Sequence, residues 1–163
     1  MVKILAIAHY LFAASLSGYY SKEDWQNWAD IQILKEEKPE EWIFAVSLAS
    51  DLDALSKALS EQLITESHTI RNTSLFSDAV IGFLYLKFLS KQISMRELLL
   101  MSGDEADGGE GSSVSCEEFY MILNELENKK SLEKDRIFIK KISHLYESFE
   151  NIARNQIEVL KNY

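Results

Sequence analysis

Residues 74–101 read SLFSDAVIGFLYLKFLSKQISMRELLLM and decide the fold of this chain. Between residues 75 and 89, apolar side chains would point to every side of a helix. A helix that is apolar all round belongs in the middle of a protein. Its longest apolar run, residues 79–86, is too short to cross a bilayer and ends at Lys87. We therefore predict a central apolar helix over residues 75–90, followed by a short helix that Ser94 and Glu97 open as a capping box.

Amphipathic helices are expected around this hairpin. A first helix over residues 3–17 should stop at Gly18. The next, over 22–36, should bury a stripe of apolar residues spaced three apart, namely Trp25, Trp28, Ile31 and Leu34. Further helices are predicted over 39–49, after Ser50, over 116–128 and over 132–161, with a loop over 65–73. No strand pattern and no repeat is present, so we predict an all-α, single-domain bundle of seven or eight helices over residues 1–163.

Composition sets the class of protein. The chain has 163 residues, of which 47% are hydrophobic and 26% charged, which is typical of one globular domain. Its one cysteine, Cys116, cannot form an internal disulfide, so nothing calls for an oxidising compartment. The N-terminal residues have the rough layout of a secretory signal, but His9 and Tyr10 interrupt the apolar segment. We therefore expect a first helix there and a cytoplasmic protein.

Charge is distributed unevenly along the chain. The net charge is −9, and residues 102–128 carry eight acidic side chains and no basic one. Such a protein should repel nucleic acid and anionic membranes and attract a basic protein partner. Within this segment, residues 103–113 (GDEADGGEGSS) have the composition of a flexible acidic loop, either a solvated linker or a partner-binding loop. For the second alternative, the expected contact residues are Asp104, Glu105, Asp107 and Glu110.

No metal or cofactor site follows from the sequence. The acidic loop fits no register of an EF-hand, and no lysine follows its glycines as a phosphate cradle requires. His9, His68 and His144 lack the spacing of metal ligands, and His144 with Glu147 is typical of a helix-surface pair. Cys116 is expected in the first turn of a helix, which favours a thiolate, but Glu117 and Glu118 oppose it. A structural role is therefore the preferred interpretation of Cys116.

Three tryptophans lie within eighteen residues, at Trp25, Trp28 and Trp42. Tryptophan buries a large area and is common both in cores and at binding hot spots. Core packing between two helices is the preferred interpretation, and aromatic contact with a partner is the alternative.

The region of this cluster resembles a family. Gly18, Trp25-x-x-Trp28-Ala29-Asp30, Pro39-x-x-Trp42-Ile43 and Ser47-Leu48 are similar to a run in small, acidic, helical bacterial proteins of the polymorphic-toxin immunity type. The similar run covers about a fifth of the chain. The resemblance implies a non-enzymatic inhibitor of one cognate toxin and transfers no site residue.

The leading hypothesis is therefore a non-enzymatic cytoplasmic protein-binding protein, of the immunity type, whose partner is a basic toxin such as a nuclease. Two alternatives stay open. One is a small-molecule-binding or enzymatic bundle in which His9 or His144 lines a pocket between helices. The other is a structural or homo-oligomeric protein built on the long C-terminal helix.

Overall fold

The computed structural model describes residues 5–69, 76–109 and 111–163, and in these residues it contains eight α-helices, one 3-10 helix and no strand. The predicted all-α bundle of seven or eight helices is thus confirmed. The chain divides into two compact units. Unit 1 comprises Met1–Thr73 and Gln156–Tyr163, and unit 2 comprises Ser74–Asn155. The single domain expected from the sequence stays a prediction, and each unit is described separately.

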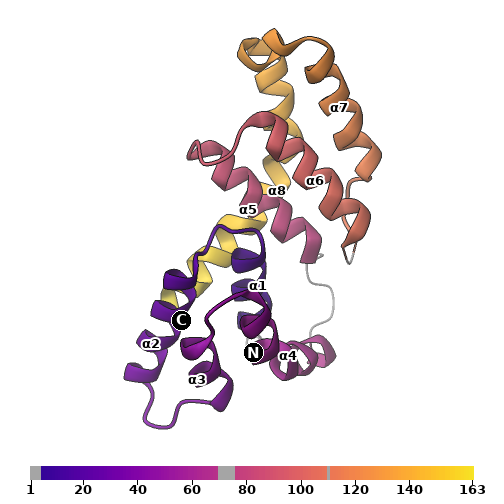
Figure 1. The fold of residues 1–163 in the computed structure, drawn as a ribbon. Coiled ribbons are helices and arrows are strands. Elements are labelled where there is room, and N and C mark those ends of the chain that lie inside the picture. The colour runs from indigo at the N-terminus through magenta and orange to yellow at the C-terminus, as the bar shows by residue number, and fades with distance from the viewer. Residues whose placement is uncertain (1–4, 70–75, 110) are drawn as a thin grey trace. The chain divides into compact units, whose positions relative to one another are not determined.

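Unit 1 contains α1 (Ile7–Leu16), α2 (Lys22–Lys35), α3 (Glu41–Leu48), α4 (Leu52–Thr69) and the last turns of α8 (Arg136–Asn162) (Figure 1). Helix α2 packs on α3, and α4 packs on both α1 and α3. Two tryptophan N–H groups join these elements. That of Trp25 donates to the carbonyl of Ala49 and that of Trp28 to the carbonyl of Leu160, both at 3.1 Å.

The buried face of α2 differs from the predicted one. Trp25 and Trp28 are buried, but Ile31 and Leu34 are 42% and 87% exposed, and Ala29 and Gln32 are buried in their place. A spacing of three residues rotates steadily around a helix, because one turn takes 3.6 residues. Alternating steps of three and four residues stay on one face, and this is the pattern of the buried residues.

Helix α4 also extends further than predicted, since the expected loop over 65–73 is helical as far as Thr69. The hydroxyls of Thr65 and Ser67 donate to the carbonyls of Glu61 and Leu63 one turn earlier. Glu66 lies between them and is buried against α1. A tertiary contact therefore holds a segment whose polar composition indicated a loop.

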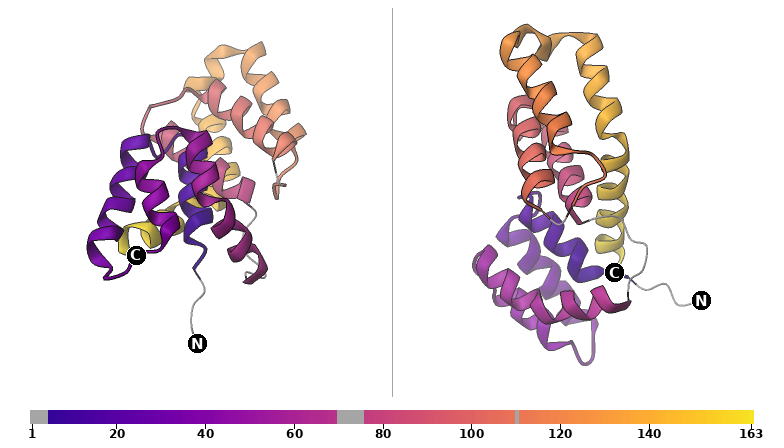
Figure 2. Two further views of the ribbon diagram at one scale, coloured as in Figure 1. Left: turned by 60° about the horizontal axis from the view of Figure 1, so that its bottom comes forward. Right: turned by 90° about the vertical axis from the view of Figure 1, so that its right-hand side faces the viewer.

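Unit 2 contains α5 (Phe76–Leu89), α6 (Met95–Gly108), α7 (Cys116–Asn128), the 3-10 helix η1 (Lys130–Lys134) and residues 136–155 of α8. Every residue of α5 from Ser77 to Leu86 is buried, as expected for the central apolar helix. Gly82 lets α8 approach, because a Cβ there would lie 2.1 Å from the carbonyl oxygen of Phe149. Figure 2 shows the helices of each unit from two further sides.

Aromatic rings fill the core of unit 2. The ring of Tyr146 lies 4.9 Å from that of Tyr85, 5.7 Å from that of Phe119 and 6.0 Å from that of Phe149. Its hydroxyl donates to Ser102 Oγ at 2.8 Å, so the one polar atom of the ring is satisfied inside the core. Burial raises the pKa of Tyr146.

The prediction of a flexible acidic loop over residues 103–113 is wrong for residues 103–108, because α6 continues through Gly108. Ser102 and Gly103 are both buried. Ser102 accepts the hydrogen bond of Tyr146 on α8, and Gly103 gives room for the ring of Tyr120 on α7. The packing of these residues outweighs the low helix propensity of glycine. Of the predicted loop, only residues 109 and 111–113 are described outside a helix.

Candidate protein-binding face

The pair of helices α6 and α7 carries the acidic segment. A capping box begins α6, in which Ser94 and Glu97 each accept a hydrogen bond from the other's backbone N–H. Ser115 caps α7 by accepting from the N–H of Glu117. The two helices pack along their apolar faces, which include the buried residues Leu98, Leu99, Phe119, Ile122 and Leu126.

Two polar contacts join the last turns of α6 to the first turns of α7. The hydroxyl of Tyr120 donates to Asp104 Oδ1 at 2.6 Å, and this hydrogen bond raises the pKa of Tyr120 to about 12. The thiol of Cys116 lies 3.8 Å from Asp107 Oδ1. Both aspartates are exposed, so their carboxylates stay in contact with solvent.

Glu117 and Glu118, in the first turn of α7, are exposed at the same end of the helix pair. We call Asp104, Asp107, Glu117 and Glu118 the acidic end of unit 2. The acids at the other end of α7 have basic neighbours. Glu125 is paired with Lys141 at 3.2 Å, and Glu127 with Arg96 at 3.1 Å. At the acidic end, by contrast, the polar contacts of the two aspartates are a phenol and a thiol.

The predicted contact residues separate in the structure. Asp104 and Asp107 are exposed, whereas Glu105 is half-buried and accepts a hydrogen bond from Ser77 on α5 at 2.9 Å. Glu110 lies outside the described residues. Glu105 therefore belongs to the packing of α6 on α5 as well as to the acidic segment.

The predicted aromatic contacts are largely internal. Trp25 and Trp28 are buried, which agrees with core packing. Trp42 is half-buried, stacks on Trp28 with ring centroids 6.1 Å apart, and donates to Glu40 Oε2 at 2.8 Å. Only Trp42 therefore offers a partner part of its ring.

Asp78, a buried carboxylate on α5, is a polar group that the sequence patterns did not indicate. Its Oδ1 accepts from the hydroxyl of Ser112 and from the N–H of Ser113, both at 2.9 Å. Asp78 thereby fixes the segment that leads into α7 and the acidic end. A lone aspartate in an otherwise apolar run is a usable signal, because a buried carboxylate needs hydrogen-bond donors.

Other candidate groups have simple roles in the described residues. His144 is exposed and lies 3.9 Å from Glu147, as expected for a helix-surface pair. No group of three His, Cys, Asp or Glu side chains in the described part of the chain could hold a metal ion. Among those residues, too, no helix combines the length and the apolar character that crossing a bilayer requires.

Unit 2 also has a pocket of about 490 Å³ between the start of α6, the end of α7 and η1. It is lined by Ser94, Arg96, Leu126, Glu127, Lys130 and Glu133. Neither His9 nor His144 lines this pocket, so it is not the histidine-lined pocket of the enzymatic alternative.

Unit 1 brings together a serine, a histidine and a glutamate. Glu66 Oε2 lies 2.7 Å from His9 Nδ1, and Ser67 Oγ lies 3.3 Å from His9 Nε2. The carboxylate of Glu66 also accepts from the N–H groups of Ala8 and His9, at 2.9 and 3.1 Å. These are free donors of the first turn of α1, so Glu66 acts as the cap of that helix.

Comparison with known proteins gives no match for this chain among protein-family models, curated proteins or solved structures.

Proposed function

We propose that this protein binds a basic protein partner through the acidic end of unit 2. The observation that carries the proposal is the placement of four exposed carboxylates, from two helices, at one end of the α6–α7 pair. A concentrated negative potential speeds the encounter with a positively charged surface and selects against acidic partners.

The position of one of these acids within its helix supports the proposal. Asp107 lies in the last turn of α6, where the helix dipole is negative and no basic residue is present. Acids at a helix C-terminus are unfavourable for stability. A basic partner would relieve this repulsion, so local electrostatic strain in the free protein becomes binding free energy in the complex.

The kind of partner follows from the same charge and from the resemblance to immunity proteins. A basic toxin, such as a nuclease, presents the positive surface that the acidic end complements. We propose that the chain is a non-enzymatic inhibitor that acts in the cytoplasm. Its one cysteine, Cys116, is a free thiol, which is compatible with the reducing conditions there.

The experiment is a binding titration with the product of the gene next to the one that encodes this chain. The test variant is D104N/D107N/E117Q/E118Q. The matched control, E23Q/E61Q/E133Q/E147Q, neutralises the same number of exposed acids elsewhere. We expect the association rate to fall about tenfold or more in the test variant, with a weaker dependence on salt, and much less in the control.

Equal losses in both variants would mean that total charge matters and the acidic end does not. Unchanged binding in the test variant would exclude the acidic end as the contact surface. Circular dichroism of both variants shows whether the helices are retained.

The contacts among Ser67, His9 and Glu66 raise a second candidate function, that of a hydrolase. In such a site the serine hydroxyl must give its proton to the histidine. Here the Ser67 hydroxyl donates to the carbonyl of Leu63 at 2.8 Å, which directs the proton away from His9. A fluorophosphonate probe distinguishes the hydrolase from the binding protein, since a hydrolase would be labelled at Ser67 and would lose the label in H9A. We expect no labelling.

A further inference from the structure

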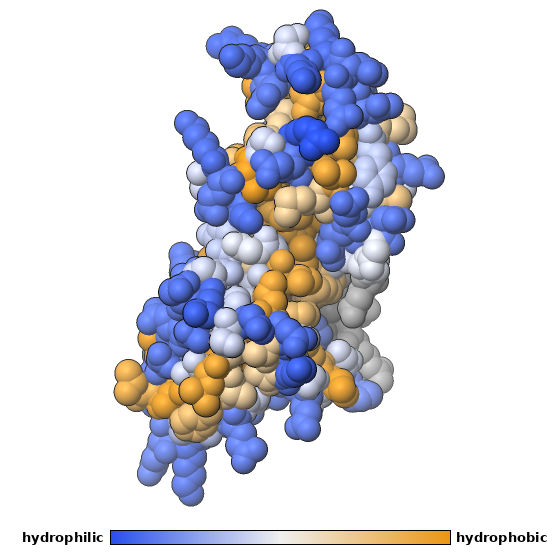
Figure 3. Space-filling view, in the orientation of Figure 1, coloured by the Kyte–Doolittle hydropathy of each residue, from blue (hydrophilic) through white to orange (hydrophobic). Residues whose placement is uncertain are grey.

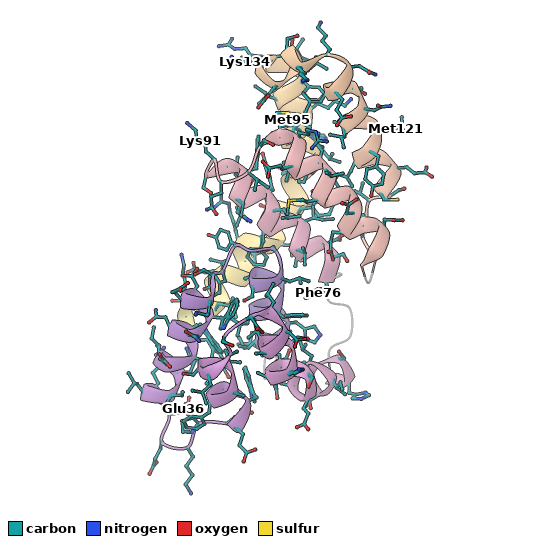
Figure 4. All side chains as sticks on the ribbon, in the orientation of Figure 1. Glu36, Phe76, Lys91, Met95, Met121 and Lys134 are labelled. Carbon is teal, nitrogen blue, oxygen red and sulfur yellow. The ribbon has the colours of Figure 1, made fainter. Side chains whose placement is uncertain are left out.

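Unit 1 exposes apolar side chains on the neighbouring helices α2 and α3. Leu34 is 87% exposed, Leu48 82% and Phe44 44%. We call these three residues the α2–α3 patch. Figure 3 shows hydrophobic side chains at the surface near the connection between the two helices, where Figure 4 labels Glu36.

A hydrogen bond between the helices places the three residues on one side. The hydroxyl of Ser47 on α3 donates to the carboxylate of Asp30 on α2. Leu34 lies one turn after Asp30, and Phe44 lies about one turn before Ser47. Trp25 contacts Ala49 and Trp28 contacts Trp42, so α2 and α3 are antiparallel. Going forward from Asp30 to Leu34 along α2 and backward from Ser47 to Phe44 along α3 therefore leads in the same direction. Leu48 follows Phe44 on the same strip of α3, since residues four apart share a face.

Leu34 and Leu48 are among the most exposed large apolar side chains of the described residues. Each large apolar side chain that leaves water contributes about 1.5–3 kcal/mol. Contiguous exposed apolar side chains with a polar surround mark interaction sites. On the same helices Trp25 and Trp28 are buried and Trp42 is half-buried, whereas Leu34 and Leu48 are almost fully exposed.

The charge of the segment that carries the patch indicates what can cover it. Residues 22–53, which include α2 and α3, carry nine acidic and three basic side chains. In a symmetric pair of chains the same surface meets itself, so these acids would face each other. Juxtaposed like charges disfavour such an interface by several kcal/mol. The acidic composition of this segment therefore disfavours a second copy and anionic lipid, and it fits a basic partner.

We propose that the α2–α3 patch binds a basic amphipathic helix of a partner protein. The apolar side chains of that helix would lie on Leu34, Phe44 and Leu48, and its lysines or arginines would face the surrounding carboxylates. Phe44 and Leu48 are one helical turn apart, which matches the spacing of apolar anchors along a bound helix. This surface lies in unit 1 and is independent of the acidic end of unit 2, so either proposal can fail alone.

The test uses the full chain and a fluorescent amphipathic helical peptide of leucine and lysine, followed by anisotropy at physiological salt. The test variant is L34S/L48S. The matched control, M121S/I137S, replaces two side chains of unit 2 that are 67% and 82% exposed. Met121 extends outward from α7 in Figure 4. We expect the affinity to fall at least tenfold in L34S/L48S and to stay within twofold of the parent in M121S/I137S and in the variant with a neutralised acidic end.

Each other outcome overturns the proposal. Absence of peptide binding does so, and so does binding that L34S/L48S leaves unchanged. A leucine–glutamate peptide that binds equally well would remove the charge argument. Sedimentation that shows a dimer lost in L34S/L48S would assign the patch to a second copy. Binding to phosphatidylserine vesicles that depends on Leu34 and Leu48 would assign it to a membrane.

Discussion

Tyr120 and Asp104 form a hydrogen bond of 2.6 Å from the phenol of α7 to the carboxylate of α6, next to Gly103, whose missing side chain leaves room for the ring. The phenol is the donor, so the contact exists only while Tyr120 is protonated. The hydrogen bond therefore links the acidic end to the protonation of one tyrosine.

The first prediction concerns pH. The pKa of Tyr120 is raised from 10.0 to about 12, so between these values the folded chain holds a proton that the unfolded chain loses. This contribution to stability is complete below pH 10 and is lost as pH rises through 12. We expect Y120F to lose less stability than the parent chain over this window, measured by urea unfolding at a series of pH values. Y120F keeps every other tyrosine of the chain, so parallel curves would contradict the assignment.

The second prediction uses two acids at opposite helix ends. Asp107 lies in the last turn of α6 and Glu117 in the first turn of α7. The helix dipole disfavours the first charge and favours the second, each by about 0.3–1 kcal/mol. We expect D107N to raise the unfolding free energy and E117Q to lower it, although both remove one negative charge. A shift of the same sign in both variants would show that overall charge repulsion dominates.

Local patterns predicted the elements whose cause is local. The apolar run of α5 and the capping box at Ser94 need only neighbouring residues, and both are present. The exposure of Asp104 and Asp107 also follows from composition. These parts of the fold and of the candidate site depend on residues within one or two helical turns.

The corrected parts depend on contacts between distant residues. Gly103 is buried because Tyr120, on the next helix, fills the space beside it, and Glu66 is buried because α1 presents free N–H groups. Neither contact leaves a periodic signal in its own segment, where glycine and polar residues indicated loops. The partners of a side chain across helices cannot be inferred from one sequence without the packing.

The third prediction concerns the cap that Glu66 provides. Its carboxylate accepts from two backbone N–H groups of α1 and contacts His9 Nδ1 at 2.7 Å. Hydrogen bonds to a charged group are worth about 1.5–3 kcal/mol, so E66Q should reduce stability by a similar amount. Hydrogen exchange should show the largest loss of protection at the start of α1. The control is E61Q, which changes an exposed glutamate on the same helix and should leave the hydrogen exchange of α1 unchanged. Equal exchange in E66Q and the parent chain would refute the cap.

The fourth prediction compares two helical glycines. A Cβ at Gly82 would lie 2.1 Å from the backbone oxygen of Phe149, which cannot move without shifting α8, whereas a Cβ at Gly108 meets nothing within 4 Å. Overpacking in a core costs about 1–3 kcal/mol, while alanine in place of an unobstructed helical glycine gains about 0.5–1 kcal/mol. We expect G82A to lower and G108A to raise the midpoint of thermal unfolding. A neutral G82A would show that α5 and α8 do not approach closely at this position. A destabilising G108A would show that α6 ends before Gly108, which would contradict the placement of Asp107 beside Cys116.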